Sequence, residues 1–114
     1  MTKAGERELV KVEHVNGGAG FITREQLVSS EEVGEACRMY AKISVLPNCE
    51  IGYHEHHGET ETYYLTKGAG IYNDNGKEYP VEVGDVTFCA DGNGHGIKNT
   101  GEEDLVFVAL ILKK

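Results

Sequence analysis

Apolar and polar residues alternate along most of the chain after residue 38, in short runs that turn residues separate. Such alternation is typical of strands, because successive side chains of a strand point to opposite faces. No segment after residue 38 has the length or the spacing of an ordinary helix. The runs that we predict to be strands are residues 38–46, 51–56, 60–66, 70–74, 77–83, 86–90, 95–99 and 105–112.

The connections between these runs contain residues that favour tight turns. Asn75-Gly76 is the clearest, because a two-residue hairpin turn needs a positive φ at both central positions. Pro47-Asn48, Lys67-Gly68 and Gly84-Asp85 mark further connections. Many short strands at this spacing predict an all-β, antiparallel sandwich or barrel.

Residues 1–37 are the least patterned part of the chain. The stretch VNGGAGFI (15–22) is typical of a loop that leads into a short apolar step. The stretch TREQLVSSEEVGEA (23–36) has Leu27 and Val28 as its main apolar pair, so we expect irregular structure with at most one helical turn. We therefore predict an irregular or short-strand segment over 1–37 that packs on a barrel formed by 38–114, in a single domain.

Composition argues against some classes of partner and indicates a cellular location. The formal net charge of −8 argues against nucleic acid, because an acidic surface repels phosphates. No apolar run approaches the ~20 residues of a membrane helix, and no leader peptide is evident. The odd count of three cysteines, without CxxC spacing, indicates reduced thiols and a cytoplasmic protein.

Candidate chemistry is concentrated in the stretch GYHEHHGETE (52–61). Strand alternation places His54 and His56 on one face and His57 on the other, so we expect His57 at the surface. If the next strand pairs with this one, Glu61 comes beside His56. Glu59 is a nearer carboxylate, but we expect it to be a solvated turn residue.

His95 is a fourth candidate, at the start of a later strand. Neutral imidazoles with one carboxylate suit first-row divalent metals, and four protein ligands leave positions open on a six-coordinate ion. The alternative is a metal-free barrel in which these residues are ordinary polar side chains.

These residues fall into two motifs that resemble those of the cupin superfamily. The first motif runs from His54-x-His56, through four residues to Glu61 and six more to Gly68. The second motif begins with Gly84 and continues through five residues to ADG (90–92) and then NG. It ends with His95, three residues and Asn99.

Two positions depart from the family pattern: Ala90 replaces a proline, and Asn48 replaces a glycine. Asparagine tolerates left-handed backbone angles, so that turn can survive. The resemblance implies a small cupin β-barrel of jelly-roll type. It implies one divalent transition metal per chain (Mn, Fe, Ni or Zn), with His54, His56, Glu61 and His95 as ligands.

The resemblance also implies a range of functions. We expect a metal-dependent enzyme acting on a small organic acid, keto acid or sugar derivative, by decarboxylation or isomerisation. The alternatives are an iron(II) dioxygenase and a non-catalytic, metal-dependent binder or sensor of a small ligand. The sequence identifies no general acid or base; Tyr63 and Phe88 are candidate substrate contacts. By family analogy we expect a homodimer, which would also cover exposed strand edges.

Overall fold

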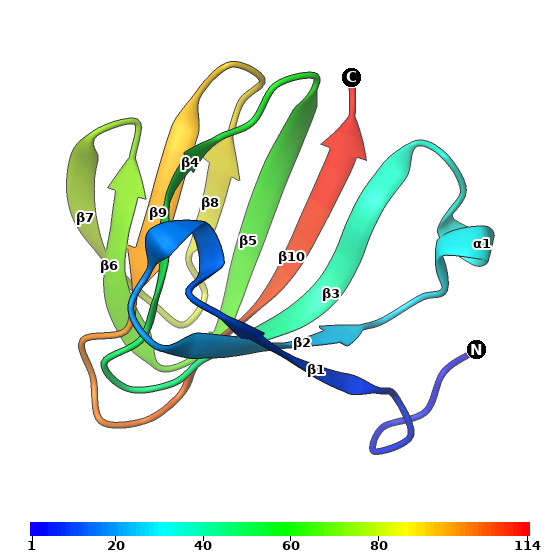
Figure 1. Cartoon of the computed structure of the whole chain (residues 1–114), viewed down its shortest axis with the longest axis horizontal. Helices are drawn as coiled ribbons and strands as arrows, with labels where there is room; N and C mark the ends of the chain where they lie inside the picture. The colour runs from blue at the N-terminus through cyan, green and yellow to red at the C-terminus, as the bar shows by residue number, and fades with distance from the viewer.

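The computed structural model describes all 114 residues, and two antiparallel sheets make up almost all of it (Figure 1). The larger sheet has six strands in the order β1-β2-β3-β10-β5-β8. Its strands are β1 (Leu9–Glu13), β2 (Phe21–Gln26), β3 (Cys37–Val45), β5 (Glu59–Lys67), β8 (Val86–Cys89) and β10 (Leu105–Lys113).

The smaller sheet has four strands in the order β4-β9-β6-β7. Its strands are β4 (Glu50–Glu55), β6 (Ala69–Asp74), β7 (Lys77–Glu82) and β9 (Gly94–Lys98). Because neighbours such as β4 and β9 are far apart in sequence, the chain crosses repeatedly between the sheets. The fold is thus an antiparallel β-barrel of jelly-roll type, which confirms the predicted class and all eight predicted strands.

The turns follow the predicted backbone chemistry. Asn75 and Gly76 have φ angles of 52° and 100°, and they join β6 to β7 as a two-residue hairpin. Asn48, where the resemblance expects a glycine, has a φ of 65°, so the left-handed turn is kept. The Asn99 amide donates to the carbonyls of Val45 and Glu103, both at 2.8 Å, and fixes the loop between β9 and β10.

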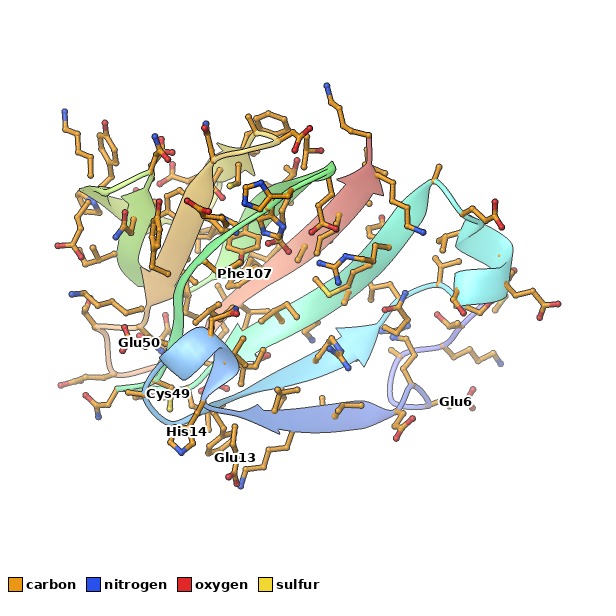
Figure 2. The ribbon with its side chains drawn as sticks, turned by 45° about the horizontal axis from the view of Figure 1, so that its top comes forward. Glu6, Glu13, His14, Cys49, Glu50 and Phe107 are labelled. Atoms are coloured by element: carbon orange, nitrogen blue, oxygen red, sulfur yellow. The ribbon has the colours of Figure 1, made fainter.

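The core lies between the two sheets and comes from both. Fourteen buried residues form one apolar cluster, and Phe107 is fully buried in it (Figure 2). Alternation along β10 sends Phe107, Ala109 and Ile111 inward. By contrast, His14 is exposed at the edge of the molecule, as expected for a polar residue outside the strand pattern (Figure 2).

The first 37 residues are more regular than their pattern suggests. Strands β1 and β2 extend the larger sheet beside β3, and a 3₁₀ turn, η1 (Val15–Gly17), lies between them. The single expected helical turn is α1 (Ser30–Val33), which the Ser29 side chain caps through the amide of Glu32. Apart from this short turn the chain has no α-helix, and hence no helix that could span a membrane.

Candidate metal centre

Strand β4 and the residue after it orient two of the four predicted ligands. His54 and His56 point between the sheets, with His56 only 4% exposed. Tyr53, Glu55 and His57 take the alternate positions and are exposed, as predicted for His57. The alternation of this strand therefore brings two imidazoles to the interior without burying the charged residues between them.

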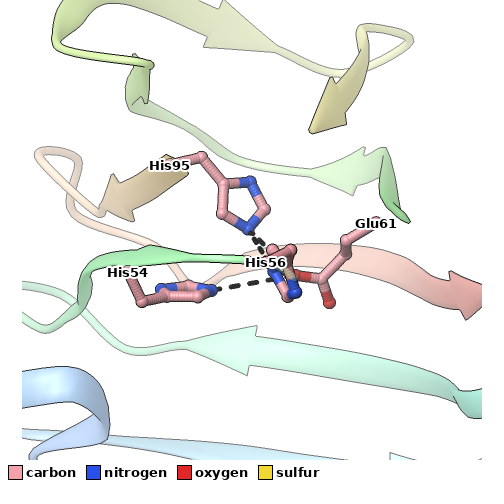
Figure 3. Close-up of side chains that lie close together, drawn as sticks. All are labelled: His54, His56, Glu61 and His95. Atoms are coloured by element: carbon pink, nitrogen blue, oxygen red, sulfur yellow. Dashed lines mark hydrogen bonds and ion pairs between the residues drawn. The ribbon is translucent and has the colours of Figure 1, made fainter. Parts of the chain in front are cut away.

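The other two ligands come from strands far away in sequence. The register of β4 with β9 places His95 directly opposite His54. The pairing of β4 with the following strand, which was the condition for placing Glu61 beside His56, does not occur, because β5 belongs to the larger sheet and pairs with β10 and β8. Glu61 therefore reaches the histidines across the interior of the barrel rather than along a hairpin (Figure 3).

The four side chains converge on one point (Figure 3). The Glu61 Oε1 atom lies 3.0 Å from the Nε2 atoms of both His56 and His95, and 3.9 Å from the Nε2 atom of His54. The Nε2 atoms of His56 and His95 are 3.1 Å apart. One donor atom from each of the four residues lies within 4.8 Å of every other, so the set could hold one metal ion.

On the side of each histidine ring that faces away from the centre, the Nδ1 atom has its own hydrogen-bond partner. His54 Nδ1–H donates to the carbonyl of Gly52 at 2.8 Å, and His56 Nδ1–H donates to the Glu59 carboxylate. The Tyr72 hydroxyl lies 2.7 Å from His95 Nδ1 and can accept from it. With a proton on every Nδ1, each Nε2 presents a lone pair to the centre.

This donor set fits a divalent cation. With His56 and His95 in that tautomer, two nitrogen lone pairs face each other at 3.1 Å, an arrangement that only a proton or a metal ion between them stabilises. Donors at right angles on ~2.1 Å bonds stand ~3.0 Å apart, which matches the three short distances. Three imidazoles and one carboxylate suit Mn, Fe, Ni or Zn alike.

The charge state of Glu61 agrees with a ligand role. Burial alone would raise the pKa of this carboxyl group, but His54, His56 and His95, which donate to it when Nε2 carries a proton in place of a metal, outweigh burial and hold the pKa well below its usual range. Burial lowers the pKa of the His95 imidazole, which favours the neutral form that a metal needs. The Glu61 hydrogen bond raises the pKa of His56, so a proton competes there with a cation.

Glu59 contacts the candidate site, which the sequence-based expectation missed. It is not a solvated turn residue: its side chain is 14% exposed and bonds both His56 and Arg38. The Arg38 Nε and Nη2 atoms donate to its two oxygens at 2.7 and 2.8 Å, and this bond lowers the pKa of Glu59 to about 2. The position of Glu59 three residues after His56 could have indicated their contact. Nothing in the sequence links Arg38 to the site.

Comparison with known proteins agrees with this arrangement. The family model described as "Cupin domain" matches residues 41–111, which include all four predicted ligands. The chain belongs to the cupin family. An oxalate-binding protein of Thermotoga maritima is 38% identical over 112 residues, 98% of this chain and 93% of that protein.

Solved structures show the same cupin fold. A crystal structure of a predicted oxalate decarboxylase from Thermotoga maritima has a TM-score of 0.96 and 35% identity, and covers 100% of this chain and 99% of that one. An RmlC-like cupin from Shewanella frigidimarina, at 16% identity, has a TM-score of 0.79 and covers 100% of this chain and 90% of that one. At that identity the second likeness shows the fold alone.

A cavity of about 370 Å³ adjoins the centre of this cupin. His54, His56 and Glu61 line it, together with Tyr63, one of the two predicted substrate contacts. Tyr63 is fully buried and stacks on His95, with ring centroids 5.0 Å apart. Burial and the nearby Glu61 charge raise the pKa of its phenol well above the ordinary value, so the hydroxyl keeps its proton.

The structure does not bring Phe88 to this cavity. Phe88 is 58% exposed on the outer face of β8, while Thr87 and Cys89 take the inward positions. The sequence alone left the inward face of this short strand undetermined, because both faces carry apolar residues. Cys89 is buried, and burial raises the pKa of its thiol to about 11.

Proposed function

We propose that this cupin holds one divalent transition metal with His54, His56, Glu61 and His95, and binds a small organic acid at it. The observation that carries the proposal is the convergence of four donors, three of them oriented from behind, at the wall of a cavity. A bound divalent ion would supply a Lewis acid that polarises carboxylate or carbonyl oxygens. The description of the Thermotoga maritima relative as oxalate-binding supports the choice of a carboxylate.

The chain's own residues support binding more directly than turnover. Glu61 belongs to the ligand set, and Glu59 is engaged by Arg38 and His56, so neither carboxylate is free to act as a general base. Glu59 would hold the His56 imidazole in one orientation, and Glu61 would supply the anionic metal donor. The apolar walls of the cavity exclude water from the bound acid and strengthen its electrostatic contacts.

The test is calorimetric titration of organic acids, from oxalate to adipate, into metal-free and Mn²⁺-loaded protein. We expect binding that needs the metal and that Glu61→Gln abolishes, because that variant loses the anionic ligand. His57→Ala, which alters an exposed histidine of the same stretch, is the matched control and should bind normally. Equal binding with and without metal, or no binding by loaded protein, would refute the proposal.

A metal-dependent decarboxylase or isomerase is the second candidate, and Tyr63 favours it. Tyr63 lines the cavity, and its hydroxyl, which keeps its proton, would be the donor to the carbanion that loss of CO₂ leaves. Release of CO₂ from loaded protein, lost in Tyr63→Phe while the acid still binds, would establish this activity. Consumption of O₂ with an Fe²⁺-loaded sample would instead select the dioxygenase alternative.

We also propose a homodimer and a cytoplasmic location. The outer face of the larger sheet exposes apolar side chains on adjacent strands: Tyr64 (51%), Val86 (63%) and Phe88 (58%). A second copy that packs on this face would remove them from water. Light scattering should give twice the chain mass, and a monomer mass would refute the dimer. The three free cysteines support a reducing compartment.

A further inference from the structure

The cavity beside the metal centre is larger and more apolar than oxalate requires. Its volume is about 370 Å³, and half of its lining residues are hydrophobic. Four isoleucines from both sheets contribute: Ile22, Ile43, Ile51 and Ile111. Oxalate is two carboxylates joined by a single bond and offers no C–H surface to such walls. An apolar wall gains free energy only when it covers apolar ligand surface.

An arginine without an ion-pair partner, Arg24, also lines this cavity. Arg24 shares its face of β2 with the buried Ile22 and is paired in register with the buried Ile43, so its side chain is directed inward. It is half-buried and lines the cavity. Arg7 and Arg38 form ion pairs with glutamates, whereas no carboxylate lies within ion-pair distance of Arg24. A half-buried, unpaired guanidinium favours an anionic ligand group.

Arg24 lies apart from the metal ligand Glu61 along the larger sheet. Strand β2 is separated from β5, which carries Glu61, by β3 and β10. At the usual spacing of strands, the backbones of β2 and β5 are ~14 Å apart along the sheet. The long arginine side chain covers part of that span, and the isoleucines line what remains. A ligand that touches both ends must therefore carry two polar groups separated by an apolar body.

We propose that the preferred ligand is an elongated dicarboxylate. One carboxylate would lie at the metal, the hydrocarbon body would lie against the isoleucines, and the second carboxylate would bind Arg24. This inference rests on the proposed function, because it takes the metal-bound carboxylate from there. It adds a residue that determines specificity, Arg24, which selects ligands by length and by charge at the far end.

The test compares three acids by calorimetry on Mn²⁺-loaded protein: oxalate, adipate and hexanoate. Adipate and hexanoate share a six-carbon chain, but hexanoate lacks the second carboxylate. We expect adipate to bind tightest, and Arg24→Met to weaken adipate about tenfold while leaving hexanoate unchanged. Lys42→Met is the matched control: it removes a positive charge from β3 outside the cavity lining and should change no affinity.

Tightest binding of oxalate, or an adipate affinity that Arg24→Met leaves unchanged, would overturn the inference and leave the proposed function standing. Failure of all three acids to bind metal-loaded protein would remove both. The ranking of the three acids on the parent protein needs no variant, so it decides the question even if Arg24→Met does not fold.

Discussion

The hydrogen bond from His56 to Glu59 yields a quantitative prediction about metal affinity. Glu59 accepts the Nδ1–H of His56, and the guanidinium of Arg38 holds it from the other side. Because Glu59 lies outside the ligand set, replacing it removes no metal donor. An acceptor behind a metal-binding histidine fixes the ring and makes Nε2 more basic, and its loss typically costs ten- to a hundredfold in affinity.

Two variants of Glu59 should lose metal affinity by amounts at the two ends of that range. Glu59→Gln keeps an amide oxygen that can accept from His56, so we expect about tenfold weaker binding, about 1.4 kcal/mol. Glu59→Ala removes the acceptor and leaves the His56 ring free to turn, so we expect a loss nearer a hundredfold, about 2.7 kcal/mol. Arg38 is half-exposed, so water can solvate it in either variant.

The assay is competition between each protein and a chelator of known affinity for Zn²⁺ or Mn²⁺. Glu55→Gln is the matched control: Glu55 is exposed and pairs only with the exposed His57, so its loss should not change the affinity. If Glu59→Ala bound the metal as tightly as the parent, the reasoning about His56 would be refuted.

Three further predictions concern stability and reactivity. Metal at a free concentration a hundredfold above Kd should stabilise the fold by about 2.7 kcal/mol and raise Tm by several degrees; an unchanged Tm after chelation would contradict this. Asn99→Ala should cost about 1–3 kcal/mol in urea unfolding, because two carbonyls lose their donor, whereas the exposed neighbour Thr100→Ala should be neutral. At pH 8 a thiol reagent should modify Cys37 before Cys89, since burial raises the pKa of Cys89 to about 11; equal rates would argue against its burial.

Most of the fold could be predicted from local sequence. The eight strands after residue 38 are bounded by turn residues whose backbone angles the structure confirms, such as Asn48 and Asn75. The distribution of those strands between two sheets could not be predicted, because it depends on contacts distant in sequence. For this reason no local pattern indicated that β4 and β5 lie in opposite sheets.

Polar residues at inward positions prevented the prediction of strand β2 from the sequence. Of its inward positions, Ile22 is apolar, but Arg24 and Gln26 are polar, so the alternation of a strand is lost. A polar residue at an inward position breaks the hydrophobic pattern, and such exceptions are expected where a site is built. The same reasoning explains why Arg24 did not emerge as a candidate from the sequence.

The candidate ligands could be predicted because two motifs define their spacing. The residues that support those ligands could not be predicted. Tyr72, which bonds His95, reads in the sequence as an ordinary core tyrosine of an alternating strand. Arg38 comes from a strand of the other sheet, far in sequence from the histidines. Contacts of this kind depend on the closed barrel and leave no local signal.

Elemental analysis of the untagged protein tests most directly whether the three histidines and Glu61 hold a metal ion. The parent is compared with His95→Ala and with the surface variant His57→Ala, all reloaded with Mn, Fe, Ni or Zn and freed of excess metal. We expect about one metal ion per chain in the parent and in His57→Ala, and a clear loss in His95→Ala. A parent that retains no metal after reloading, or a His95→Ala variant that retains as much, would contradict this expectation.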